Sequence, residues 1–107
     1  MINLKKIKPE IIKRLLPLNP DKIILFGSYA NGDANEDSDI DLFIMKDNIT
    51  IEDTREIERQ ARRYLRDLVF KYKIGIDILS GPTDYVQARE DYFYKEDIRK
   101  NGVVWYE

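Results

Sequence analysis

The chain has 107 residues, with 18 Lys and Arg against 20 Asp and Glu, and it contains neither Cys nor His. This length suits one domain over residues 1–107, and the formal net charge of −2 lacks the basic field that general nucleic-acid or anionic-membrane binding requires. The missing Cys and His exclude disulfides, thiolate nucleophiles and imidazole bases, which leaves carboxylates, hydroxyls, Lys, Arg and oxygen-bound cations for chemistry. Since no apolar run reaches the roughly 18 residues of a membrane span, we expect a cytoplasmic protein.

The first half of the chain predicts a helix, two buried strands and a loop between the strands. Apolar residues recur every three or four positions near the start, as on one face of a helix, and two later apolar runs have the length of buried strands. Turn-forming and acidic residues separate these two runs. The expected elements are a helix from about Lys5 or Pro9 to Leu16, a strand at Lys22–Phe26, a loop over residues 31–38 and a strand at Ile40–Met45.

The second half predicts a long helix, a third strand and a shorter closing section. Thr50 and Asp53 have the spacing of a capping box, and apolar residues at steps of three and four follow them. An alternating strand comes next, and Ser80-Gly81-Pro82 should end it. The expected elements are a helix to about Lys73, a strand at Ile74–Leu79, helical turns around Tyr85–Arg89 and Lys95–Lys100, and a last strand at Val103–Tyr106. This order predicts one α/β (α+β) domain.

An acidic segment leads into the second strand. Asp39 and Asp41 lie two apart there, so their carboxylates share one face, where they could bridge one or two divalent cations. A solvated acidic loop is the alternative, but it would not alternate Asp with apolar strand residues. A calcium loop of the EF-hand type is disfavoured, because Ser38 and Ile44 stand where that loop needs Gly and Glu. The acids of this segment, with no basic residue among them, are Asp33, Glu36, Asp37, Asp39 and Asp41.

The pair Gly27-Ser28 ends the first strand. Gly allows the backbone to approach a ligand closely, and the Ser hydroxyl with nearby N–H groups can cradle a phosphate. Alone, such a pair is more often a turn, and it is not a Walker P-loop because no Gly-Lys-Ser/Thr follows. Ten residues separate it from Asp39-Ile40-Asp41, and apolar strands stand on both sides.

In this spacing and context the chain resembles the minimal nucleotidyltransferases, small members of the DNA polymerase β-like superfamily. The resemblance covers nearly the whole chain, up to a closing Gly102–Glu107, and implies a small mixed sheet flanked by helices. It also implies a third carboxylate on a neighbouring strand, for which Asp77 is the candidate between Ile76 and Ile78, which should point into the core. An ion pair with an Arg of the long helix is the structural alternative for Asp77.

The resemblance further implies Mg²⁺-dependent transfer of AMP from ATP. Asp39, Asp41 and Asp77 would be catalytic and hold two Mg²⁺ ions, with Asp77 also accepting the proton of the attacking hydroxyl, while Gly27 and Ser28 would bind the β and γ phosphates. Similar stand-alone proteins are typically encoded with a helical HEPN ribonuclease toxin and act as its antitoxin by adenylylating a toxin tyrosine. We therefore expect a protein adenylyltransferase antitoxin with a HEPN partner, alone or in a homo- or hetero-oligomer.

Two other functions stay open. The chain could neutralise a partner by binding alone, without catalysis, or it could transfer a nucleotide to a small molecule or an RNA end. A basic stripe on the long helix has the same ambiguity: it is either a solvated face paired with neighbouring Glu or a contact with triphosphate, RNA or an acidic partner. Its members are Arg55, Arg59, Arg62 and Arg66. The aromatic residues of the last quarter are expected in the core or an interface.

Overall fold

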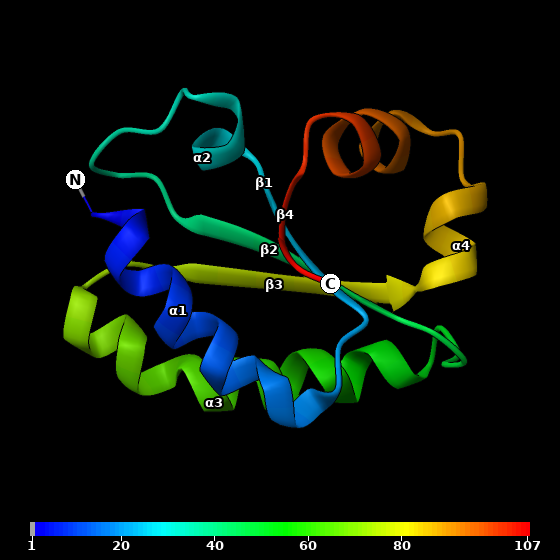
Figure 1. Cartoon of the computed structure of the whole chain (residues 1–107), viewed down its shortest axis with the longest axis horizontal. Helices are drawn as coiled ribbons and strands as arrows, with labels where there is room; N and C mark the ends of the chain where they lie inside the picture. The colour runs from blue at the N-terminus through cyan, green and yellow to red at the C-terminus, as the bar shows by residue number, and fades with distance from the viewer. Residues whose placement is uncertain (1) are drawn as a thin grey trace.

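The computed structural model describes residues 2–107 and shows a four-stranded mixed sheet with helices packed on both faces (Figure 1). The strand order is β3-β2-β1-β4; β1 is antiparallel to β2 and β4, and β2 is parallel to β3. The strands are β1 (Lys22–Phe26), β2 (Ile40–Lys46), β3 (Ile76–Pro82) and β4 (Val103–Tyr106). The helices are α1 (Leu4–Leu15), η1 (Leu16–Leu18), α2 (Ser28–Asn31), α3 (Asp53–Tyr72), α4 (Thr83–Ala88) and the π-helix η2 (Phe93–Lys100). The predicted small mixed sheet flanked by helices is confirmed.

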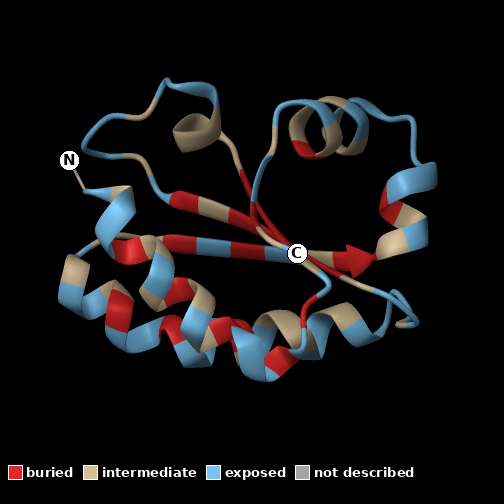
Figure 2. Ribbon diagram, in the orientation of Figure 1, coloured by how far each residue is buried: buried red, intermediate tan, exposed pale blue. Residues whose placement is uncertain are grey.

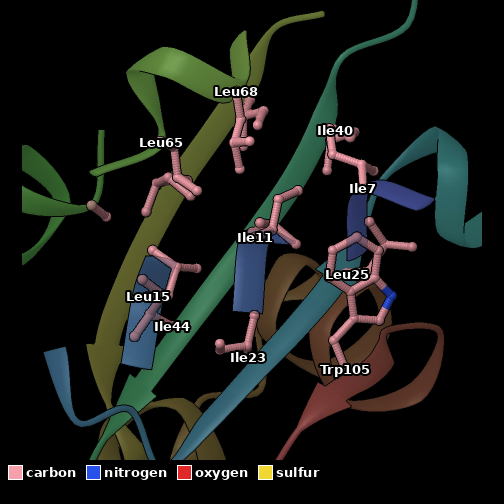
Figure 3. Close-up of a cluster of buried hydrophobic side chains, with 14 of the residues drawn as sticks. Ile7, Ile11, Leu15, Ile23, Leu25, Ile40, Ile44, Leu65, Leu68 and Trp105 are labelled. Carbon is pink, nitrogen blue, oxygen red and sulfur yellow. The ribbon is translucent and has the colours of Figure 1, made fainter. Parts of the chain in front are cut away.

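Helices α1 and α3 cover one face of the sheet and hold the main core (Figures 1 and 3). Their inward residues recur at helical spacing, and Figure 2 shows the buried positions of both helices turned toward the strands. Burying one such Ile or Leu side chain contributes about 1.5–3 kcal/mol. The buried positions of the two helices are Ile7, Ile11 and Leu15 in α1 and Ala61, Leu65 and Leu68 in α3.

A smaller cluster fills part of the other face, where η2 and α4 pack on β1 and β2. Phe93 of η2 meets Phe26 of β1 edge to face, with ring centroids 5.5 Å apart, and Tyr94 meets Phe43 in the same way at 6.0 Å. Trp105 lies in the main core and is 8% exposed. These late aromatic residues therefore belong to the core, as expected.

The capping box and most element bounds are confirmed. The Thr50 amide donates to the Asp53 carboxylate at 2.8 Å, and the Asp53 amide donates to the Thr50 hydroxyl at 3.3 Å. Helix α1 begins at Leu4, earlier than expected, because the Asn3 side chain caps it by accepting from the Lys5 amide at 3.0 Å. Among residues 2–107, none of the helices combines the length and the apolar character needed to cross a membrane.

The expected bounds of the third strand are wrong at both ends. Strand β3 begins at Ile76, two residues late, and continues through Ser80 and Gly81 to Pro82, which pairs with Lys46. A proline is tolerated there because β3 is an edge strand, where an amide that faces away from the neighbouring strand takes no part in the ladder. Gly81 stays in the strand, paired with Met45, and its lack of a side chain leaves room for Phe43 and Val86.

Candidate active site

Gly27 makes the turn between β1 and α2. Its φ of 76° and ψ of −155° lie outside the regions open to residues with a Cβ, and a Cβ at this position would overlap the Asp41 carboxylate. The Gly27 carbonyl accepts from the amides of Ala30 and Asn31 at 3.1 and 3.0 Å, which starts the short helix at Ser28. The turn thus brings the backbone of Gly27 and Ser28 directly against an acidic side chain of β2.

Three candidate carboxylates lie in, or directly before, two neighbouring strands. Asp41 of β2 is in register with Asp77 of β3 on one side and with Phe26 of β1 on the other. Asp39 precedes β2 by one residue and lies close enough for its charge to act on Asp41. Asp77 is exposed between two buried isoleucines, so its side chain points away from α1 and α3, as expected. The register of the parallel pair therefore brings Asp41 and Asp77 together.

This grouping of acids changes the acidity of Asp41. Burial, the negative charges of Asp77 and Asp39, and a hydrogen bond shared with Asp77 raise the pKa of Asp41 to about 6. Burial and the charge of Asp39 also raise the pKa of Tyr29, which follows Ser28. The negative charges around Asp41 are therefore not fully neutralised by nearby groups of the described chain. Such an excess of negative charge is typical of a site that binds a cation.

The raised pKa of Asp41 predicts a pH-dependent stability difference between the wild type and Asp41→Asn. Between pH 4 and about 6 the folded protein binds more protons at Asp41 than the unfolded chain, so this residue lowers the free energy of unfolding as the pH rises through 6. Since the carboxylate is partly solvated, the effect should be about 1 kcal/mol, or about 4–8 °C in Tm. In EDTA, Asp41→Asn should melt above wild type at pH 7.5 but not at pH 4.5; an equal difference at both pH values would contradict the shift.

Gly75 is a site residue that the sequence reasoning missed. It precedes β3, and a Cβ there would overlap the carboxylate of Asp39. Gly27 therefore leaves room for Asp41, and Gly75 leaves room for Asp39. The signal in the sequence is that Gly75 stands two residues before Asp77, inside the segment predicted as the strand Ile74–Leu79.

The donor set is suited to a hard cation. Asp39, Asp41 and Asp77 offer only carboxylate oxygens, the ligands that Mg²⁺ prefers. Within the part of the chain that the structure describes, no three acidic side chains stand in ligating positions as they are. Three carboxylates that lie close together repel one another unless a proton or a cation neutralises part of their charge. The raised pKa of Asp41 has the same cause.

The basic stripe of α3 has one internal ion pair. Arg59 donates to Glu56 at 2.6 and 2.9 Å, whereas Glu58 accepts from the amide and hydroxyl of Ser80. In residues 2–107, no salt bridge joins an Arg of α3 to Asp77, so the structural alternative for that aspartate lacks support. The other stripe members, Arg55, Arg62 and Arg66, likewise have no salt bridge in this part of the chain.

The chain is similar in sequence to nucleotidyltransferases along most of its length. The family model described as "Nucleotidyltransferase domain" matches residues 4–101. "Putative protein adenylyltransferase MJ0141" from Methanocaldococcus jannaschii is 36% identical over 94 residues, 87% of this chain and 86% of that protein. "Putative protein adenylyltransferase MJ0604" from the same organism is 31% identical over 85 residues, 79% of this chain and 77% of that protein.

Solved structures share the fold. A "putative nucleotidyltransferase" from Sulfolobus solfataricus has a TM-score of 0.67 and 18% identity, over 95% of this chain and 78% of that one. The toxin–antitoxin MntA–HpeT has a TM-score of 0.57 and 17% identity, over 92% and 71%. A toxin–antitoxin with AMP-PNP has a TM-score of 0.54 and 20% identity, over 91% and 71%.

Proposed function

The chain belongs to the nucleotidyltransferase domain family, and on that premise we propose that it transfers AMP from ATP to a hydroxyl group of a protein. The observation that carries the proposal is that Asp41 and Asp77 are in register on neighbouring strands. The backbone turn at Gly27 lies directly against the Asp41 carboxylate, where a side chain on Gly27 would not fit. Two relatives bear the name of protein adenylyltransferases, which supports AMP as the group transferred and a protein as the acceptor.

Each site residue has a role in this proposal. The acceptor oxygen attacks the α-phosphorus of ATP, a new P–O bond forms, and the bond to the leaving pyrophosphate breaks. Asp77 accepts the hydroxyl proton, and the backbone of Gly27 with the Ser28 hydroxyl holds the β and γ phosphates. Asp39, Asp41 and Asp77 would hold Mg²⁺, which supplies neutralisation of the triphosphate charge and acidification of the acceptor hydroxyl.

For the acceptor we propose a tyrosine of a HEPN-family toxin, so that the chain acts as an antitoxin. Support comes from the shared fold with the toxin–antitoxin structures, one of which contains AMP-PNP. Neutralisation by binding alone is the competing function.

Mass spectrometry tests this function. The chain is mixed with ATP, Mg²⁺ and a candidate HEPN toxin, and the toxin should gain the mass of one or more AMP groups on a tyrosine. Replacing ATP by its α,β-methylene analogue, whose bridge between the α and β phosphorus atoms cannot be cleaved, should abolish the gain. A partner that binds the chain but gains no mass would contradict the enzymatic function.

A further inference from the structure

The open edge of the sheet runs past the proposed proton acceptor. Strand β3 is last in the strand order, so no strand of residues 2–107 pairs with its outer side. The Gly75 carbonyl accepts from β2 at 2.9 Å, whereas the Ser80 amide donates to the Glu58 carboxylate of α3 at 2.9 Å. Backbone groups alternate in direction along a strand, so the amides two and four residues before Ser80 also point outward. These outward amides, which have no partner strand among residues 2–107, are those of Ile76 and Ile78, whose side chains are buried in the main core.

A groove of about 390 Å³ follows this edge between β3 and α3. Its α3 wall carries Arg62, Arg66 and Phe70, which are four residues apart and therefore follow one line along the helix. Phe70 is 75% exposed, and the two arginines have no salt bridge within residues 2–107. Asp77 lies on the opposite wall. The groove thus combines two available cations, an exposed aromatic ring and open backbone groups beside one candidate catalytic residue.

We propose that an extended, acidic segment of the acceptor protein binds along this edge as an additional strand and brings its hydroxyl to Asp77. Its backbone pairs with the amides of Ile76 and Ile78, its acidic side chains face Arg62 and Arg66, and an apolar side chain covers Phe70. The inference rests on the proposed function for the identity of the bound protein as an acceptor. The positive charges of Arg62 and Arg66 favour an acidic segment. The outer side of β3, which has no partner strand among residues 2–107, favours an extended one.

The structure also limits how this segment binds. Glu58 already occupies the Ser80 amide, so backbone pairing is confined to about three residues and side chains must supply most of the affinity. Asp77 repels acidic groups, so these must lie toward the arginines, away from the hydroxyl that reacts. Leu79 lies two residues beyond Asp77 on the same face and is 42% exposed, which offers an apolar contact next to the reacting residue.

Amide hydrogen exchange with a defined probe tests the strand addition. The probe is a random copolymer of Glu and Tyr, and a copolymer of Lys and Tyr is the control. Without nucleotide, the wild-type chain should bind the Glu–Tyr copolymer, and exchange at the amides of Ile76 and Ile78 should slow about tenfold or more. Binding without protection of these two amides, or equal binding of both copolymers, would overturn the proposal.

Paired charge reversals test the arginines. Arg62→Glu with Arg66→Glu should weaken binding of the Glu–Tyr copolymer about tenfold or more, while the affinity for ATP stays unchanged. Lys13→Glu with Arg63→Glu changes the net charge equally at exposed residues outside the groove and should leave both affinities unchanged. Equal loss in both double variants, or a parallel loss of ATP affinity, would overturn the proposal. Protected binding of the Glu–Tyr copolymer supports the docking surface whether or not the proposed toxin gains AMP, whereas a toxin that binds the chain but gains no AMP counts against the proposed function alone.

Discussion

Replacing Asp39 and Asp41 together by Asn is expected to lower the rate of AMP transfer about a thousandfold or more. Asparagine keeps the approximate size of each side chain but removes the negative charges of Asp41 in β2 and of Asp39 just before it. The double variant should fold and, in EDTA at pH 7.5, melt above the wild type, because repulsion between the acids is relieved. The rate of AMP incorporation into the proposed toxin partner and the Tm are the two measurements.

A matched pair in the same acidic segment controls for the loss of charge. Asp33→Asn with Asp37→Asn removes the same two charges from exposed loop residues and should transfer AMP at close to the wild-type rate. If the Asp39 and Asp41 double variant still neutralises the toxin as well as wild type, neutralisation does not need catalysis. Binding alone would then be the function, and the adenylyltransferase proposal would be wrong.

Gly27→Ala should impair both the site and the fold. An alanine at a φ of 76° is strained, and its methyl group overlaps the Asp41 carboxylate, so either the turn or Asp41 must move. We expect a destabilisation of about 1–3 kcal/mol and a loss of AMP transfer of about a hundredfold. Thermal melting and steady-state transfer rates, compared at a temperature where the variant is folded, separate the two effects.

Gly32→Ala is the control for backbone strain alone. Gly32 ends α2 with a φ of 80°, close to that of Gly27, but a Cβ there meets nothing within 4 Å. Gly32 has a ψ of 13°, in the left-handed helical region, so the Gly32→Ala variant should lose about 1–2 kcal/mol of stability and still transfer AMP at nearly the wild-type rate. If both variants lose the same fraction of activity, the contact between Gly27 and Asp41 does not matter for catalysis.

Local pattern determines most of the fold of this chain. The run of β1 was predicted at Lys22–Phe26, where it lies, because a short apolar run between a proline turn and a glycine leaves little choice of bounds. The same reasoning ended β3 too early, at Leu79. The strand continues through Ser80, whose amide donates to Glu58, a residue 22 positions earlier in the sequence. The π-helical form of η2 was not predictable either, because its spacing differs from an α-helix by less than one residue per turn.

The residues of the candidate site are a prediction of the sequence, whereas their geometry appears only in the structure. The distance in sequence between Ser28 and Asp39 indicated the acids, and strand alternation placed Asp77 on the correct face. Nothing in the pattern indicated that Asp41 and Asp77 would be in register, because register depends on how β2 and β3 dock through α3. For the same reason Gly75 was missed: its role appears only when the strand beside it is in place.

The two glycines that accommodate Asp39 and Asp41 also bear on how such a site can change over generations. While the acids are present, neither Gly75 nor Gly27 can be exchanged without a collision. Replacing Asp39 by a smaller residue removes the overlap at Gly75, whereas Gly27 remains held by its φ of 76° even without Asp41. Descendants of this chain that abandon catalysis should therefore diverge first at Gly75, and a retained glycine there should accompany a retained Asp39.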